Sequence, residues 1–92
     1  MKITQLINSN GNAATNQFNI QTNKGNYFQS YQTIIAFQDR YGNTPVLSSA
    51  WDCSATTLKH LKLFLCTSLS KKEIQKRIDA GSIIVTDIIT VE

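Results

Sequence analysis

The sequence holds few of the residues from which catalytic and metal sites are usually built. Its 92 residues include a single histidine and two cysteines, and these lack the paired spacing that a zinc site requires. A thiol nucleophile could take His60 as its base, but Cys66 follows six residues later, on roughly the opposite side of a helix. Cys53 and Cys66 are therefore predicted to be buried thiols in a reducing compartment. We expect a protein that is not an enzyme and uses no metal or cofactor.

Long apolar runs and glycine-rich loops are also missing. The four glycines stand singly at expected turns, so no glycine loop is present to hold a phosphate. Lys59 and Lys62 interrupt the one leucine-rich stretch, which argues against a membrane span. Met1 and Lys2 are followed by polar residues instead of the apolar core of a secretory leader. We expect a soluble intracellular protein.

Acidic side chains are scarce where the positive charge is concentrated. Nine basic residues face six acidic ones, for a net charge of +3, and up to Gln38 only Lys2 and Lys24 are charged. Between residues 59 and 77, six basic residues accompany one acid, Glu73. This asymmetry directs one face of the helical half toward an anionic partner. The basic candidate contact residues are Lys59, Lys62, Lys71, Lys72, Lys76 and Arg77.

Aromatic side chains on or near the predicted sheet could extend this basic surface. Tyr27, Tyr31 and Tyr41 would add stacking or packing contacts. Such a mixture suits RNA or a protein groove that takes basic residues. An ordinary solvated helix face explains the lysines equally well, so both interpretations stay open.

Three hydroxyls gather at the start of the first expected helix, at Ser54, Thr56 and Thr57. Together with the free backbone amides of a helix start, they could hold a phosphate. The alternative is a capped helix whose threonines satisfy its own first-turn donors. We favour the capped helix, because hydroxyl N-caps are common.

Strand patterns fill the first half of the chain. Phe18 and Ile20 alternate with polar residues, and the turn at residues 23–26 contains a glycine that can adopt positive φ. Residues 33–37 are β-branched and aromatic, which suits a central, buried strand. The remaining expected elements are strands at 27–31 and 46–51, a loop at 11–16, and a segment at 2–7 that fits a strand or a helical turn.

The second half changes to helical periodicity. Ser54 is a good N-cap, and a capping box at Ser70 and Glu73 begins a second helix that Gly81 ends. Residues 82–91 form a β-branched tail that we expect to close the sheet, with a bend near residue 86. The core-facing residues of the first helix and its approach are Trp51, Leu58, Leu61, Phe64 and Leu65.

These patterns predict an α+β fold in a single domain, residues 1–92. With 41% apolar residues the chain has enough hydrophobic material for one core. The expected architecture is a small antiparallel sheet of four to five strands, completed by the C-terminal strand and covered on one face by two helices.

The middle of the chain resembles a small uncharacterised domain common in phages and other mobile elements. The resemblance centres on a Ser-x-Thr-Thr-x-Lys-His-Leu core at residues 54–61, and Cys53 stands where that pattern has an aromatic. The family implies no activity that can be carried over residue by residue. The matching residues are Phe28, Ser30, Tyr31, Thr33, Ile35, Ala36, Leu47, Trp51, Asp52, Ser54, Thr56, Thr57, Lys59, His60, Leu61, Phe64 and Leu65.

This resemblance implies a prophage protein in the cytoplasm of a bacterial host, and small basic prophage proteins of this kind include anti-CRISPR inhibitors. We therefore predict a non-enzymatic protein that binds and inhibits a host defence complex, with an RNA-guided nuclease (a CRISPR effector) or its guide RNA as the leading target. Two alternatives stay open: a stand-alone RNA- or DNA-binding regulator, and a structural protein that forms homo-oligomers. The Ile-rich tail leaves a homodimer open as well.

Overall fold

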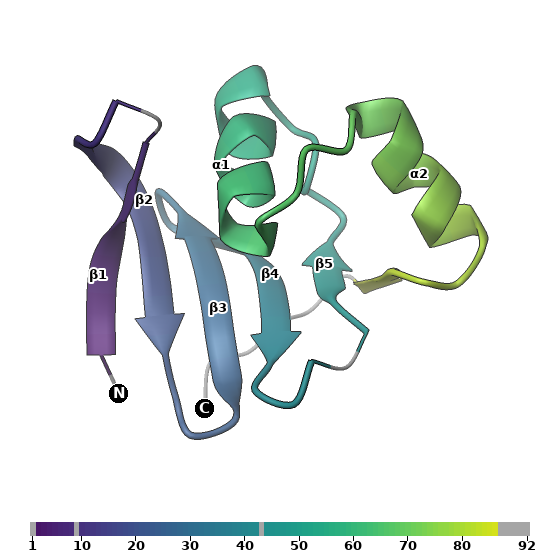
Figure 1. The fold of residues 1–92 in the computed structure, drawn as a ribbon, viewed down its shortest axis with the longest axis horizontal. Helices are drawn as coiled ribbons and strands as arrows, with labels where there is room; N and C mark the ends of the chain where they lie inside the picture. Colours follow the sequence, from purple (N-terminus) through teal and green to yellow (C-terminus); the bar gives the residue numbers. More distant parts are fainter. Residues whose placement is uncertain (1, 9, 43, 87–92) are drawn as a thin grey trace.

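The computed structural model describes residues 2–8, 10–42 and 44–86, and these confirm the predicted α+β class. The described residues form one six-stranded sheet and two helices (Figure 1). In chain order the elements are β1 (Lys2–Ile7), β2 (Ala13–Gln21), β3 (Gly25–Ser30), β4 (Thr33–Asp39), β5 (Val46–Ser48), α1 (Ala55–Leu65), α2 (Lys71–Asp79) and β6 (Ile84–Thr86).

The strands lie side by side in the order of the chain, β1 to β6. Each neighbouring pair from β1 to β5 is antiparallel, and each of the links β1–β2, β2–β3 and β3–β4 is a short turn. The last pair differs from the prediction of an antiparallel sheet, because β6 runs parallel to β5, with Leu47 opposite Val85. Both helices lie between these two strands in the chain. This long connection lets the chain return to the sheet in the same direction. The sheet also has more strands than the four to five predicted.

Several element boundaries differ from the sequence prediction. The ambiguous segment at residues 2–7 is a strand, and much of the predicted loop at 11–16 belongs to β2. The predicted strand at 46–51 ends at Ser48, because the Trp51 backbone N–H donates to the Ser48 carbonyl at 3.1 Å and closes a turn. The predicted closing strand is described only as far as Thr86, and residues 87–91 lie outside the described part of the chain.

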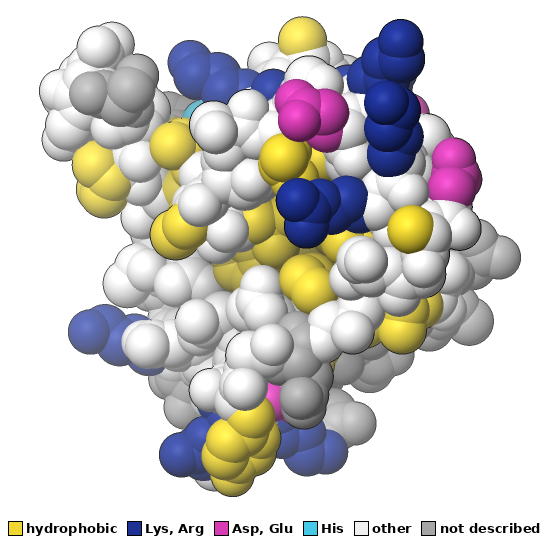
Figure 2. Space-filling view, turned by 45° about the vertical axis from the view of Figure 1, so that its right-hand side comes forward, with side chains coloured by type: hydrophobic (Ala, Val, Ile, Leu, Met, Phe, Trp, Pro, Cys, Tyr) yellow, Lys and Arg dark blue, Asp and Glu magenta, His cyan; other side chains and the backbone are white. Residues whose placement is uncertain are grey.

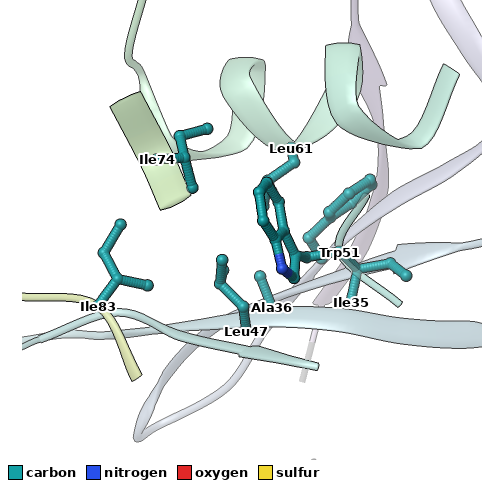
Figure 3. Packing of buried hydrophobic residues seen from close by; sticks show 8 residues of the cluster. Ile35, Ala36, Leu47, Trp51, Leu61, Ile74 and Ile83 are labelled. Carbon is teal, nitrogen blue, oxygen red and sulfur yellow. The ribbon is translucent and has the colours of Figure 1, made fainter. Parts of the chain in front are cut away.

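The main core lies between the helices and one face of the sheet. Phe28, Ala36 and Leu47 stand opposite one another on β3, β4 and β5, and all three are fully buried. The register shifts after Phe28, and this bulge accompanies the burial of both Ile35 and Ala36 in the core. Figure 3 shows the Trp51 indole between the sheet residues and Leu61. The remaining members of this cluster are Trp51, Leu61, Ile74 and Ile83.

The predicted helix signals are confirmed. Ser54 caps α1, since its Oγ accepts the Thr57 backbone N–H at 3.1 Å. Ser70 and Glu73 form the predicted capping box of α2. Gly81, with φ of 83°, follows Ala80 as predicted, and the N–H groups of Gly81 and Ser82 donate to carbonyls of the last turn of α2.

Candidate functional site: the basic surface of α2

The second helix is capped at its start and buries one side, so its basic side chains lie on the exposed sides. The Ser70 backbone N–H donates to the Glu73 carboxylate at 3.1 Å, and the Glu73 backbone N–H donates to Ser70 Oγ at 3.2 Å. These two bonds satisfy donors that a helix start leaves without intrahelical partners. Of the nine residues of α2, all described, only Ile74 is buried. The helix therefore attaches to the core by one side and leaves the other sides to solvent.

Three of the predicted basic residues lie along one side of α2. Lys71, Lys72 and Lys76 line a shallow surface hollow with Gln75 and Asp79. The spacing of Lys72 and Lys76 places them one turn apart on the same helix face. The Lys71 Nζ lies 3.5 Å from a carboxylate oxygen of Asp52, in the turn before α1. Because the Lys71 side chain is 60% exposed, this ion pair contributes little to stability.

A second hollow lies on the other side of α2 and has an apolar floor. Arg77 lines this groove, which has a volume of about 170 Å³, together with Ile74 from the same helix. Lys76 and Arg77 also line a neighbouring hollow beside Glu73. Figure 2 brings this side forward and shows Lys and Arg side chains around a depression in which hydrophobic atoms are visible. The other residues that line the groove are Gln38, Pro45, Leu65, Thr67, Leu69, Ser82 and Ile83.

The two lysines of α1 are not part of these hollows. Lys59 is exposed on α1, and Lys62 is half-buried in its last turn, where a cation interacts favourably with the helix dipole. The structure thus brings together Lys71, Lys72 and Lys76, and places Arg77 next to them on the groove side. We call these four residues of α2 the basic surface.

The three predicted tyrosines do not form a stacking platform. Tyr27 is only 4% exposed, and its ring centroid lies 4.6 Å from that of Phe37. Tyr31 and Tyr41 are exposed, but they follow β3 and β4 and so lie near opposite ends of the sheet. Of the three predicted aromatic contact residues, only Tyr31 and Tyr41 are therefore accessible, and they do not lie side by side. Tyr27 is inaccessible because residues on both faces of β3 are buried, whereas a sheet with one solvent-exposed face would leave alternate residues accessible.

Among the described residues, neither cysteine is hydrogen-bonded to His60. Both cysteines are exposed, which corrects the prediction of buried thiols. Cys66 follows the apolar stripe of α1 in the left-handed conformation (φ 55°, ψ 45°), which ends the helix at the surface. His60 is buried, and its Nδ1 donates to the Thr56 carbonyl at 2.8 Å. Among the described residues, no cluster of three His, Cys, Asp or Glu side chains is arranged to hold a metal ion.

Two of the three hydroxyls at the start of α1, those of Ser54 and Thr57, make contacts within the fold. Thr57 is buried, and its Oγ1 lies 3.1 Å from Ser54 Oγ and 3.3 Å from Ser30 Oγ on β3. The Cys53 thiol donates to the same Thr57 oxygen at 3.6 Å. The Ser54 cap is confirmed. The Thr57 hydroxyl contacts neighbouring side chains, and not the first-turn backbone donors that we expected it to satisfy.

Sequence reasoning missed two features of the described residues. The apolar groove joins residues between 65 and 83 to Gln38 and Pro45, which lie at least twenty residues earlier in the chain, and no local pattern signals such an assembly. Arg40 was also missed, although its guanidinium lies over the Tyr41 ring, 5.2 Å from the centroid. The adjacency of a cationic and an aromatic residue at a turn was the available signal for this pair.

Acid is expected to weaken the capped start of α2. The backbone N–H and the hydroxyl of Ser70, followed by the charges of Lys76 and Arg77, lower the pKa of Glu73 from its ordinary value of 4.5. A lowered folded-state pKa means that the carboxylate stabilises the fold above the unfolded-state pKa. This contribution is lost as the pH falls through the folded-state pKa.

Urea unfolding of the protein and of a Glu73→Gln variant, from about pH 6 to about pH 3, checks this expectation. The free energy of unfolding should fall more steeply toward low pH in the parent protein, because glutamine can accept the Ser70 bond without titrating. An equal fall in both proteins would contradict a role for this carboxylate.

Among the helices of the described residues, none is long and apolar enough to cross a membrane. Searches found no matching curated protein and no matching solved structure. A family model described as "Family of unknown function (DUF8033)" matches residues 1–80. Because the match covers most of the chain, including the whole of α1 and α2, the protein belongs to this family of unknown function.

Proposed function

We propose that this protein is a non-enzymatic phage or prophage protein that binds and inhibits a host defence complex through the basic surface of α2. The leading target is an RNA-guided nuclease. The resemblance of residues 54–61 to a domain of mobile elements supports the proposed phage or prophage origin. The observation that supports α2 as the binding surface is the position of Arg77. This cation lines an apolar groove and lies next to three lysines on the same helix.

This combination favours an acidic protein surface over a nucleic acid. Interfaces between proteins combine a desolvated apolar centre with charged groups at the rim, and arginine is enriched among the residues that contribute most. The groove supplies the apolar centre, and Lys72, Lys76 and Arg77 supply the rim. Single-stranded RNA would instead need aromatic side chains beside the cations, and the two exposed tyrosines lie apart from each other.

Reversing the charge of the basic surface is expected to abolish inhibition. A Lys72→Glu, Lys76→Glu, Arg77→Glu variant should bind the target about a hundredfold more weakly, since removing two to three rim contacts of about 1 kcal/mol and adding repulsion costs about 3 kcal/mol. The assay counts plaques of a targeted phage on bacteria that carry an active RNA-guided nuclease. Bacteria that express the parent protein should allow plaques, and bacteria that express the variant should not.

The matched control reverses the same amount of charge elsewhere. A Lys2→Glu, Lys24→Glu, Lys59→Glu variant changes the net charge equally at three exposed positions outside α2. It should keep inhibition if α2 makes the contact. Equal inhibition by the parent protein and the α2 variant, both shown to be folded by circular dichroism, would remove the basic surface from the interface.

The same proteins separate the proposal from a stand-alone regulator. A gel shift with host RNA at two salt concentrations tests direct binding, because binding driven by phosphate contacts weakens steeply as salt rises. Strong, salt-sensitive binding by the purified protein alone would favour the regulator. Retention on the purified nuclease complex, without binding to free RNA, would support the inhibitor.

A further inference from the structure

The strand β1 forms one edge of the sheet and lies on the far side of the molecule from α2 (Figure 1). It pairs with β2 on one side, and no other described strand pairs with its outer side. Five of its six residues are exposed. The outer side of β1 is therefore a row of backbone N–H and C=O groups, about 20 Å long, that another strand can reach.

β1 lacks the features that usually keep edge strands from pairing with one another. Proteins protect such strands with prolines, with charged side chains along the edge, or by keeping the strand very short. β1 contains no proline, and its single charged residue, Lys2, stands at its first position. Ile3 and Ile7 are 59% and 58% exposed, so two large apolar side chains lie on this neutral edge.

Two copies of β1 are complementary to each other in one antiparallel register. Side chains alternate along a strand, so Ile3, Gln5 and Ile7 lie on one side of β1. The irregularity in the pairing of β1 with β2 does not interrupt this alternation, because its extra residues lie in β2. When Gln5 lies opposite Gln5 of a second copy, each Ile3 lies opposite an Ile7. The two Lys2 side chains then lie at opposite ends of the paired strands.

The neighbouring registers match less well. A two-fold axis at Thr4 would place Ile3 opposite Gln5, and a two-fold axis at Leu6 would place Ile7 opposite Gln5. Both apolar pairs are lost in either case. The sequence of β1 therefore favours the axis at Gln5.

We propose that β1 is a homodimer interface, in which two copies join their sheets edge to edge around a two-fold axis at Gln5. The occupant is a second copy, because this register gives every exposed isoleucine an apolar partner and brings no like charges together. The two helices α2 stay on the outer sides of the dimer, so their positive charges do not oppose association (Figure 1).

The dimer is expected to exchange with the monomer, since the contact is limited to one strand of each copy and permanent interfaces are larger. β1 does not belong to the basic surface. The dimer therefore neither requires nor excludes the proposed function.

Sedimentation equilibrium from micromolar to millimolar concentration tests the dimer. The average mass of the parent protein should rise toward twice the monomer mass. Gln5→Glu and Gln5→Lys variants should each stay monomeric, because like charges would face each other at the two-fold axis. An equal mixture of the two variants should recover the dimer, because each introduced carboxylate then faces an introduced ammonium group. The matched Gln32→Glu variant, changed in the exposed turn between β3 and β4, should associate like the parent.

Three results would overturn the proposal. They are a parent protein that is monomeric throughout, a dimer formed by either Gln5 variant alone, and a mixture of the two variants that stays monomeric. Circular dichroism establishes that each variant is folded.

Hydrogen exchange of the parent protein provides a second test, which does not depend on the folding of any variant. In an edge strand, the N–H groups of alternate residues point away from the sheet, where a pairing strand protects them. Every second amide of β1 should therefore gain protection as the concentration rises, and the amides of α2 should not change. Unchanged protection of β1 in concentrated protein would overturn the proposal. Protection that dilute protein gains only with the purified nuclease complex would assign the edge to a foreign strand and would also overturn it.

Discussion

Replacing Gly25 with alanine is expected to cost the protein most of its stability. Gly25 begins β3 with φ of 152°, a conformation that side chains rarely adopt. A Cβ at this position would overlap the Gln38 backbone oxygen and come within 3.0 Å of the Arg40 backbone nitrogen. Backbone atoms cannot move aside as a flexible side chain can. The substitution must therefore push β3 and β4 apart where Gly25 pairs with Asp39.

The surrounding turn cannot absorb this displacement cheaply. The Thr22 backbone N–H and hydroxyl both donate to the Gly25 carbonyl, at 2.8 and 3.0 Å. The Arg40 backbone N–H donates to the Lys24 carbonyl at 3.1 Å, so both strands are tied to the turn. We expect Gly25→Ala to lower the free energy of unfolding by at least about 3 kcal/mol, out of a typical total of about 5–15 kcal/mol.

A second glycine provides the control for this experiment. Gly42 also has positive φ, 75°, but a Cβ added there meets no atom within 4 Å. Gly42→Ala should therefore cost only the backbone strain, about 1 kcal/mol. Urea unfolding measures both variants. Similar losses in the two would show that φ alone, and not the close approach to Gln38, explains the effect.

Replacing Ile74 with alanine is expected to detach α2 from the rest of the protein. Ile74 is the buried residue of that helix and packs into the cluster that contains Leu47 and Ile83. Truncation of a buried isoleucine to alanine costs about 2–5 kcal/mol, because apolar contacts are lost and a cavity remains. Ile78, the other α2 residue that packs against this cluster, is only partly buried, so we expect this cost to fall mainly on the local stability of α2.

Hydrogen exchange distinguishes this local loss from global unfolding. In the Ile74→Ala variant, the amides of α2 should lose protection while those of β3 and β4 keep most of theirs. Gln75→Ala is the control, because Gln75 is the exposed neighbour on the same helix. Equal loss of protection in α2 and the central strands would show that the helix and the sheet unfold as one unit. If the basic surface binds a partner, the same variant should also weaken inhibition.

The helices could be predicted because their signals are local. Ser54 and the Ser70–Glu73 pair each act within one helical turn, and Gly81 acts at the residue where the chain turns away. The β2–β3 and β3–β4 hairpins are similarly local. The parallel pairing of β5 with β6 could not be predicted, because two three-residue strands carry no register signal and come together only after both helices are placed.

The candidate site was predictable in composition but not in arrangement. The sequence shows that α2 is basic, but it does not show that Arg77 lines an apolar groove, since that groove depends on the tertiary contacts of Leu65 and Ile83. Tyr27 was misplaced for a related reason. We expected Tyr27 to contribute to a contact surface, but the structure buries it on the sheet face opposite that of Phe28.

The parallel β5–β6 pair also has a consequence for the order of folding. The pairings from β1 to β4 join neighbouring segments through short turns, so the loop-closure entropy of each is small. The β5–β6 pairing closes a loop that contains both helices, which makes it the least local contact of the described sheet. Because non-local pairings form late, we expect the β1–β4 meander to assemble first and β6 to dock last. During synthesis, β1 to β4 would leave the ribosome before the chain that completes the sheet exists.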